Sequence, residues 1–219
     1  MAEDTKYLDN AGVRHLLEKI GGTFVTKEEF NYKAISITSF TNDKNTVEMG
    51  STVDTVNLKW SLNKKATALT LDGSAVTATD TSRALTGLGL KSNKTWTLKA
   101  TDEKGASSSK TTSITFLNGV YYGVGAVPNA YDSSFVLKLT KALQSSRNKI
   151  FTLNAGAGEF IFYAIPARYG ECGFNVGGFD GGFTKVATFD FTNASGYTES
   201  YCVYKSDNAN LGNTTVTAK

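Results

Sequence analysis

Short segments of alternating apolar and polar residues, separated by turn-forming residues, dominate the chain from residue 34 onward. Side chains of a β-strand alternate between its two faces, so a period of two predicts strands. Between residues 33 and 118 these segments are KAISITSF, VNLKWSLN, ATALTLDG, KTWTLKATD and TTSITFLN. Strands that recur about every 8–12 residues, with turns between them, are typical of a β-sandwich. We therefore predict one sandwich over residues 33–118, with Trp60 and Trp96 facing each other across its core.

Residues 1–32 carry a different period. One helical face is apolar and consists of Val13, Leu16, Leu17 and Ile20. Asp9 or Asn10 can cap the start of this helix and the Gly21-Gly22 pair can end it, while Thr26 with Glu29 forms a capping box for a second short turn. A helix of about 12 residues is marginal alone in water, so the apolar stripe has to be buried. It can fold back on the sandwich or pack against another chain, and we expect the second arrangement.

Residues 119–219 are predicted to form a second β-rich domain with one helix. The segments VYYGVGAV, NKIFTLNAG, KVATFDF and SYCVYKSD are strand-like, whereas DSSFVLKLTKALQSS is typical of a helix that Asp132 or Ser133 can cap. The segment GEFIFYAI is apolar on both faces. Such a strand is either central in its sheet or has one face against another subunit. The fold class is therefore mainly β, with a helical leader, an Ig-like sandwich and a second β-rich domain.

The stretch FNVGGFDGGFTK, residues 174–185, contains two glycine pairs. It lacks the Gly-Lys-Ser/Thr ending of a P-loop and a following helix, so it does not predict a phosphate site. Two interpretations remain and are compatible: a tight β-connection that needs positive φ angles, which we favour, or a loop that displays side chains to a partner. The candidate surface binding residues are Phe179, Asp180, Phe183 and Tyr197.

The sequence proposes no catalytic or metal centre. His15 is the only histidine, and the two cysteines, Cys172 and Cys202, are expected to be free buried thiols. One histidine and two distant cysteines do not make a usual zinc site or a nucleophilic dyad. The net charge of +3 is not concentrated in a basic block, so nucleic-acid binding is not predicted. The sequence also predicts no cofactor, no signal peptide and no membrane insertion.

The order of the three parts resembles virion structural proteins of tailed bacteriophages. The leader YLDNAGVRHLLEKI is similar to the N-terminal segments of phage tail and fibre proteins. KWSLNKKATALTLDG followed by KTWTLKATDEKGASSSKTTSITF resembles the Ig-like modules of virion proteins. The most distinctive likeness is the C-terminal stretch FNVGGFDGGFTKVATFDFTNASGYTESYCVYKSDNANLG, which resembles a domain that follows such modules in phages of Firmicutes and related gut bacteria.

This resemblance implies a non-enzymatic component of a tail, baseplate or head appendage, assembled in the bacterial cytoplasm into the virion. Its expected partners are other virion proteins and copies of itself, with a trimer favoured, and a host cell-surface glycan or protein for the outer domain. A dedicated receptor- or glycan-binding protein is the alternative. A polysaccharide-degrading enzyme is a third hypothesis, which the lone histidine and the lack of a local carboxylate pair disfavour.

Overall fold

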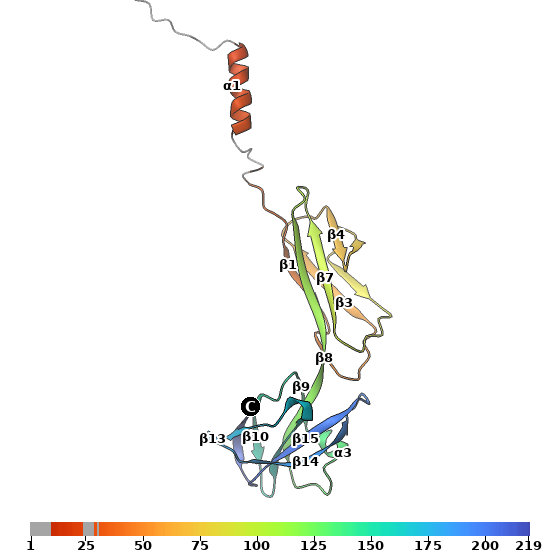
Figure 1. Cartoon of the computed structure of the whole chain (residues 1–219), viewed down its shortest axis with the longest axis vertical. Coiled ribbons are helices and arrows are strands. Elements are labelled where there is room, and N and C mark those ends of the chain that lie inside the picture. The colour runs from red at the N-terminus through yellow and green to blue at the C-terminus, as the bar shows by residue number, and fades with distance from the viewer. Residues whose placement is uncertain (1–9, 24–28, 30) are drawn as a thin grey trace, which may run out of the picture.

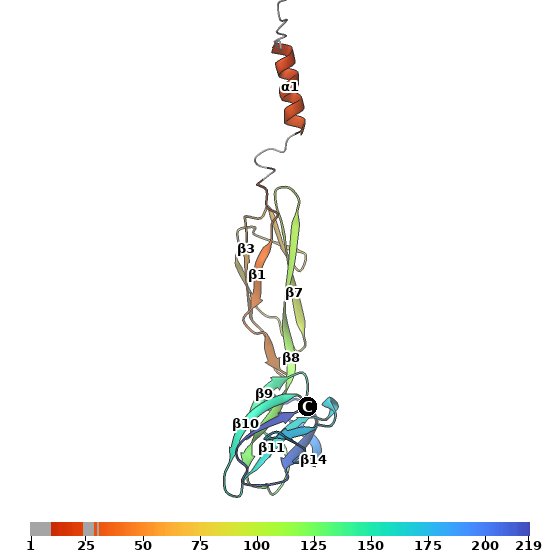
Figure 2. The same cartoon turned by 90° about the vertical axis from the view of Figure 1, so that its left-hand side faces the viewer.

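Three parts follow one another along the molecule: helix α1, a β-sandwich and a second β-rich domain (Figures 1 and 2). The computed structural model describes residues 10–23, 29 and 31–219. Helix α1 spans Asn10–Thr23, so it continues through the Gly21-Gly22 pair that the sequence predicts as its end. Asp9 and Thr26, the expected capping residues, lie outside the described residues. The chain is mainly β, which confirms the fold class.

The first β-domain consists of two sheets. One sheet contains β1 (Ile37–Asn42), β3 (Val56–Leu62) and β6 (Ser82–Leu85), and its adjacent strands run antiparallel to each other. The other contains β5 (Ser74–Val76), β4 (Ala68–Leu71), β7 (Lys94–Thr101) and the first half of β8 (Ser107–Gly125). The short strand β2 (Thr46–Glu48) pairs in parallel with β8. Immunoglobulin-like sandwiches divide their strands between two sheets in this way, so the predicted Ig-like sandwich is confirmed.

The core of the sandwich lies between these sheets and contains both tryptophans. Trp60 belongs to β3 and Trp96 to β7, and both side chains are buried there, as predicted. Phe40 packs edge-on against Trp60, with 6.2 Å between the ring centroids. The indole Nε1 of Trp60 donates to the carbonyl oxygen of Asp80 at 2.7 Å, so its polar group is satisfied within the core.

Asp102 fixes the point at which the chain enters the sandwich. Its Oδ2 accepts from the hydroxyl of Tyr32 at 2.6 Å and from the amide of Ile35 at 3.1 Å, and the ammonium of Lys64 lies 3.0 Å away. Its Oδ1 accepts from the amides of Lys104 and Ala106 in the turn that follows. Burial alone would raise the pKa of Asp102, but these hydrogen bonds outweigh it and hold the pKa well below its usual range.

Strand β8 belongs to both β-domains. Its residues 107–114 pair with β7, whereas residues 118–125 pair with β9 (Thr140–Gln144) and β11 (Phe160–Pro166). The predicted domain boundary at residue 118 therefore falls inside a continuous strand. Ile114 and Phe116 pack in the first core, and Val120, Tyr122 and Val124 pack in the second. One face of β8 thus serves both cores.

The second β-domain also has two sheets. β14 (Phe183–Thr192), β15 (Thr198–Ser206) and β11 continue the sheet that contains β8. β10 (Lys149–Ala155), β16 (Gly212–Ala218), β12 (Phe174–Val176) and β13 (Phe179–Asp180) form the other. Strand β11 is central: Tyr163 packs toward the second sheet, while Phe162 packs with α3 and β14 on the opposite face. The apolar faces of GEFIFYAI are therefore both covered within the chain.

The helix predicted in DSSFVLKLTKALQSS is wrong in its extent. Helix α3 covers only Ser133–Val136, with Asp132 as its N-cap, and the short 3-10 helix η1 follows later at Ala167–Tyr169. Residues 140–144 instead form β9. Strand β9 pairs with β8 from Asn118 to Tyr122, so ladder hydrogen bonds along the edge of β8 override the local helical pattern.

Candidate functional site

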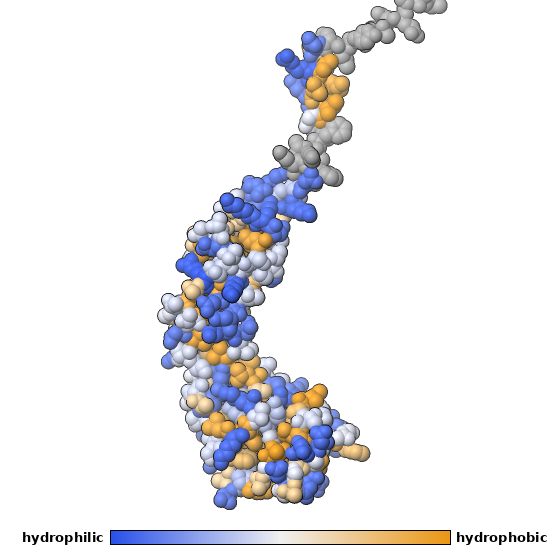
Figure 3. Space-filling view, turned by 180° about the vertical axis from the view of Figure 1, so that it is seen from behind, coloured by the Kyte–Doolittle hydropathy of each residue, from blue (hydrophilic) through white to orange (hydrophobic). Residues whose placement is uncertain are grey.

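Helix α1 presents an apolar face to solvent. Val13, Leu16, Leu17 and Ile20 are exposed, and Leu17 reaches 61%. Figure 3 shows these apolar side chains gathered along one side of the helix, with hydrophilic side chains on the other. The helix lies apart from the β-domains in Figures 1 and 2. Of the two arrangements that the sequence left open, the described residues therefore show no packing of this stripe on the sandwich.

The first glycine pair, Gly177-Gly178, forms the turn of the β12–β13 hairpin, and the second, Gly181-Gly182, connects β13 to β14. Gly177, Gly178, Gly181 and Gly182 all have positive φ, at 57°, 97°, 102° and 80°. Side chains with a Cβ are strained in that region, so glycine is required here. Asn175 holds the turn from inside, because its Oδ1 accepts from the Gly178 amide at 3.1 Å and its Nδ2 donates to Asp180 at 3.0 Å.

The four candidate binding residues do not gather in one place. Phe179 stands at the hairpin tip and is 81% exposed, and the neighbouring Asp180 pairs with Lys219 at 3.0 Å. Phe183 instead stacks on the buried Phe174, with 4.3 Å between ring centroids, so it belongs to the core. Tyr197 lies at the junction of the two β-domains. The structure thus leaves Phe179 and Asp180 as the displayed pair.

The junction between the β-domains is closely packed. Glu48 in β2 pairs with Lys141 at 2.7 Å and accepts from the hydroxyl of Tyr121 at 3.3 Å. The side-chain amide of Asn193 donates to the carbonyl oxygen of the next residue, Met49, at 2.8 Å. Gly50 approaches Tyr197 so closely that a Cβ on Gly50 would lie 2.6 Å from the Tyr197 Cβ. These contacts hold the two domains in a fixed relation.

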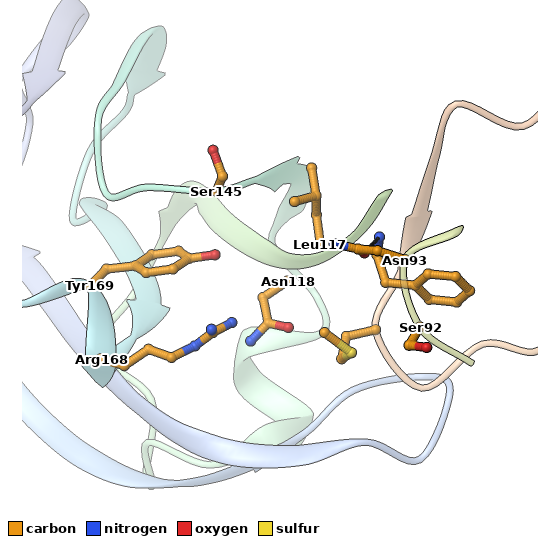
Figure 4. A pocket seen from close by; sticks show the side chains of 9 residues that line it. Ser92, Asn93, Leu117, Asn118, Ser145, Arg168 and Tyr169 are labelled. Atoms are coloured by element: carbon orange, nitrogen blue, oxygen red, sulfur yellow. Dashed lines mark hydrogen bonds between the residues drawn. The ribbon is translucent and has the colours of Figure 1, made fainter. Parts of the chain in front are cut away.

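A cleft of about 450 Å³ opens beside this junction (Figure 4). Both domains line it: Ser92 and Asn93 come from the first, whereas Ser145, Arg168 and Tyr169 come from the second. In Figure 4 the side chains of Arg168 and Tyr169 extend side by side, and the Arg168 guanidinium points toward Asn118. Polar groups of both domains therefore line the cleft.

One glutamate binds two of the residues that line this cleft. Glu199 in β15 accepts one hydrogen bond from the Nδ2 of Asn118 and another from the Nε of Arg168. The guanidinium of Arg168 also lies 5.2 Å from the ring centroid of Tyr169, whose hydroxyl donates to the carbonyl of Gln144 at 2.7 Å. Glu199 thus fixes the orientation of Asn118 and Arg168, and Arg168 in turn packs over the ring of Tyr169.

Asn118 has one atom without a partner. The residue is 2% exposed, and its Oδ1 is buried with no hydrogen bond among the described residues. Buried polar atoms in proteins are nearly always paired with protein, water or ligand. Sequence reasoning missed Asn118, Arg168 and Glu199. The available signal was a single Asn between the apolar residues of SITFLNGVYYG, but its partners are far away in sequence.

The cleft is lined by hydrogen-bonding side chains, including Ser92, Asn93 and Ser145. Burial raises the pKa of the Tyr169 phenol, with Arg168 opposing and Glu199 reinforcing the shift, so the phenol is protonated at neutral pH. His15 lies on α1, outside the cleft. Among the described residues no group of three His, Cys, Asp or Glu side chains is placed to hold a metal ion. Cys172 and Cys202 are free thiols, the first half-buried and the second buried.

Within the described part of the chain, no helix is long and apolar enough to cross a membrane. No family model and no curated protein matches the sequence. Two solved structures are similar at low overall scores. One is the N-terminal eight Ig domains of Down syndrome cell adhesion molecule isoform 1.30.30, with 9% identity and a TM-score of 0.26, which covers 82% of this chain and 25% of that chain. The other is titin A168169, with 13% identity and a TM-score of 0.27, and the match covers 85% of this chain and 92% of that chain.

Proposed function

We propose that this chain is a structural component of a tailed-bacteriophage particle, in which α1 attaches the chain and the β-domains project outward. The observation that carries the proposal is the exposed apolar face of α1 at one end of an elongated pair of β-domains. Because water disfavours a contiguous apolar face, that face needs a partner. The sequence resemblance to phage tail and fibre proteins supports a virion as the setting.

The partner that fits this face best is the same helix from other copies of the chain. Val13 and Ile20 are seven residues apart with Leu16 between them, which is the spacing of a coiled-coil seam. Leu17 widens the stripe beyond the two positions that a two-stranded seam uses. A bundle of three helices covers such a wider face, so we propose a trimer. The polar face, with Arg14, His15 and Glu18, then remains in solvent.

The test is the assembly state of the full chain and of Leu16→Asp in sedimentation experiments. Burying one leucine contributes about 1.5–3 kcal/mol, so each helix should associate at least about tenfold more weakly after the substitution. His15→Asp changes the charge equally on the polar face and should assemble normally. A wild-type chain that stays monomeric at high concentration would contradict the trimer.

The particle supplies the second half of the test. Phage that lack the gene would be complemented with wild-type protein, Leu16→Asp or His15→Asp, and the copy number in purified particles measured by mass spectrometry. We expect Leu16→Asp to be depleted and His15→Asp to be incorporated normally. Normal incorporation of Leu16→Asp would show that α1 is not the attachment element.

Binding to a host surface is a second candidate function, favoured by Phe179. A large aromatic side chain that is 81% exposed on a glycine-shaped hairpin is suited to contact a protein or glycan. Phe179→Ala should then reduce attachment to host cells at an unchanged melting temperature. Attachment that is unaffected by this substitution would leave the hairpin with a structural role alone.

A further inference from the structure

We propose that the first β-domain is a mechanical clamp, which resists tension applied along the molecule between α1 and the second domain. The chain enters this domain at the end that faces α1 and leaves it through β8, which continues into the second domain (Figures 1 and 2). The clamp is the interface of β1 and β2 with β8. That the chain is under tension in use rests on the proposed function, whereas the resistance itself belongs to the fold.

The first strand of the sandwich lies alongside the last and runs in the same direction. At the start of β1, the amide of Ile37 donates to the Oγ of Ser108 at 3.2 Å. At its end, the Nδ2 of Asn42 donates to the carbonyl oxygen of Ser113 at 3.0 Å. The partners on β8 thus advance with the residues of β1, so the two strands are parallel.

Strand β2 continues this parallel contact to the end of the domain. Residues 46–48 pair with residues 115–117 of β8. At one end of this ladder the amide of Thr115 donates to the carbonyl oxygen of Asn45 at 2.8 Å, and at the other the amide of Met49 donates to that of Leu117 at 2.9 Å. Hydrogen bonds of a parallel pair are evenly spaced along the strands, so they form one continuous row.

Tension along the molecule loads this row as a whole. A pull on the chain before β1 is directed toward α1, whereas a pull on the end of β8 is directed away from α1. Because β1, β2 and β8 run in the same direction, the two pulls slide β8 along its partners. Bonds that lie across the sliding direction share the load, whereas strands that are peeled apart from one end lose their bonds one at a time. Since forced unfolding follows the unfolding rate, sharing the load slows it.

The second domain holds the far end of β2. Glu48 pairs with Lys141 of β9 at 2.7 Å, and the Nδ2 of Asn193 donates to the carbonyl oxygen of Met49 at 2.8 Å. Strand β9 is paired with residues 118–122 of β8, so the second domain moves together with β8. Sliding of β8 away from β2 must therefore break these links between the domains as well.

Optical-tweezers measurements on the full chain compare two directions of pulling. Both use one handle at Lys33, and the second handle is at Val127, beyond the end of β8, or at Lys104, before its start; all three side chains are exposed. The hydroxyl of Tyr32 and the amide of Lys104 both donate to Asp102, so Lys33 and Lys104 lie at the same end of the sandwich. The first pair of handles shears β1 and β2 against β8, and the second pair peels them from it.

At one constant force, we expect the first domain to unfold at least about tenfold more slowly when it is sheared than when it is peeled, because several hydrogen bonds must break at once. The extension that is released, about 3.3–3.6 Å per residue, identifies the domain that has unfolded. Urea unfolding establishes that the two handle-bearing proteins are equally stable without force. Equal rates in the two directions, or faster unfolding under shear, would overturn the proposal.

Asn193→Asp tests the contribution of the second domain. The substitution keeps the Oδ1 that accepts from the amides of Ser195 and Tyr197, but it removes the donor to Met49. It should speed unfolding under shear by about two- to tenfold. The rate under peeling should not change, because peeling begins at the opposite end of β1.

Asn175→Asp is the matched control. Asn175 also accepts from a turn amide, that of Gly178, but its Nδ2 donates to Asp180 within the same hairpin. This variant should change neither rate. Equal acceleration of shearing and peeling by Asn193→Asp would show a general loss of stability and would refute the link between the domains. Because none of the handles lies on α1, these outcomes are independent of the trimer and of incorporation into particles.

Discussion

Gly50→Ala should destabilise the protein more than Gly73→Ala, although both glycines lie in turns with positive φ. The φ angles are 90° at Gly50 and 80° at Gly73, so an added Cβ is strained at either position by about 1–3 kcal/mol. At Gly73 nothing lies within 4 Å of that Cβ. At Gly50 the Cβ would lie 2.6 Å from the Cβ of Tyr197 and 3.2 Å from its backbone nitrogen. Forcing the junction apart adds about 1–3 kcal/mol, as in overpacked cores.

The expected loss of unfolding free energy is therefore about 2–6 kcal/mol for Gly50→Ala and about 1–3 kcal/mol for Gly73→Ala. Urea unfolding measures both values. The two tryptophans of the chain, Trp60 and Trp96, lie in the first domain, so their fluorescence follows that domain while far-ultraviolet circular dichroism follows both. If Gly50→Ala is no less stable than Gly73→Ala, the close contact with Tyr197 does not constrain the junction and this reasoning is refuted.

Three further predictions concern stability. The folded-state pKa of Asp102 lies below its ordinary value of 3.8, so the ionised carboxylate stabilises the fold above that value, and this stabilisation is lost as the pH falls through the folded-state pKa. Between about pH 5 and about pH 2, the melting temperature of Asp102→Asn should therefore fall less steeply with pH than that of the wild type. Equal pH dependences of the two melting temperatures would contradict this. Trp60→Ala should cost about 3–5 kcal/mol in urea unfolding, and a loss below about 1 kcal/mol would mean that the core closes over the gap. Gly181→Ala should lower stability by more than about 1 kcal/mol, because its φ is 102° and backbone strain alone acts where no atom lies within 4 Å of the added Cβ. Phe179→Ala in the neighbouring strand β13 should be nearly neutral, and equal melting temperatures of the two variants would show that the connection adapts.

Local patterns in the sequence were sufficient to predict most strands of the first domain. Trp60 and Trp96 were placed in opposite sheets because alternation assigns each side chain to a face, and the spacing of turns implies a sandwich. The glycine pairs were correctly associated with positive φ, because that requirement is local to the turn.

Features that depend on distant partners were not predicted. Residues 140–144 carry a helical pattern but become β9, because the edge of β8 supplies hydrogen bonds that no short window contains. Phe183 and Tyr197 were grouped with Phe179 as aromatic display residues, yet one packs on Phe174 and the other at the junction. The cleft depends on Glu199, which is distant in sequence from Asn118, so neither residue identifies it alone.

The shared strand β8 restricts how these two domains can be recombined in evolution or by design. Ile114 and Phe116 face the first core, and Val120, Tyr122 and Val124 face the second, in one unbroken even-numbered series. A single residue inserted at position 118 would shift this series by one and turn the apolar side chains of the second half to the wrong face. Two inserted residues would restore the faces. An exchange of either domain must therefore change the length of β8 by an even number of residues, so that the apolar side chains of both halves stay on the same face.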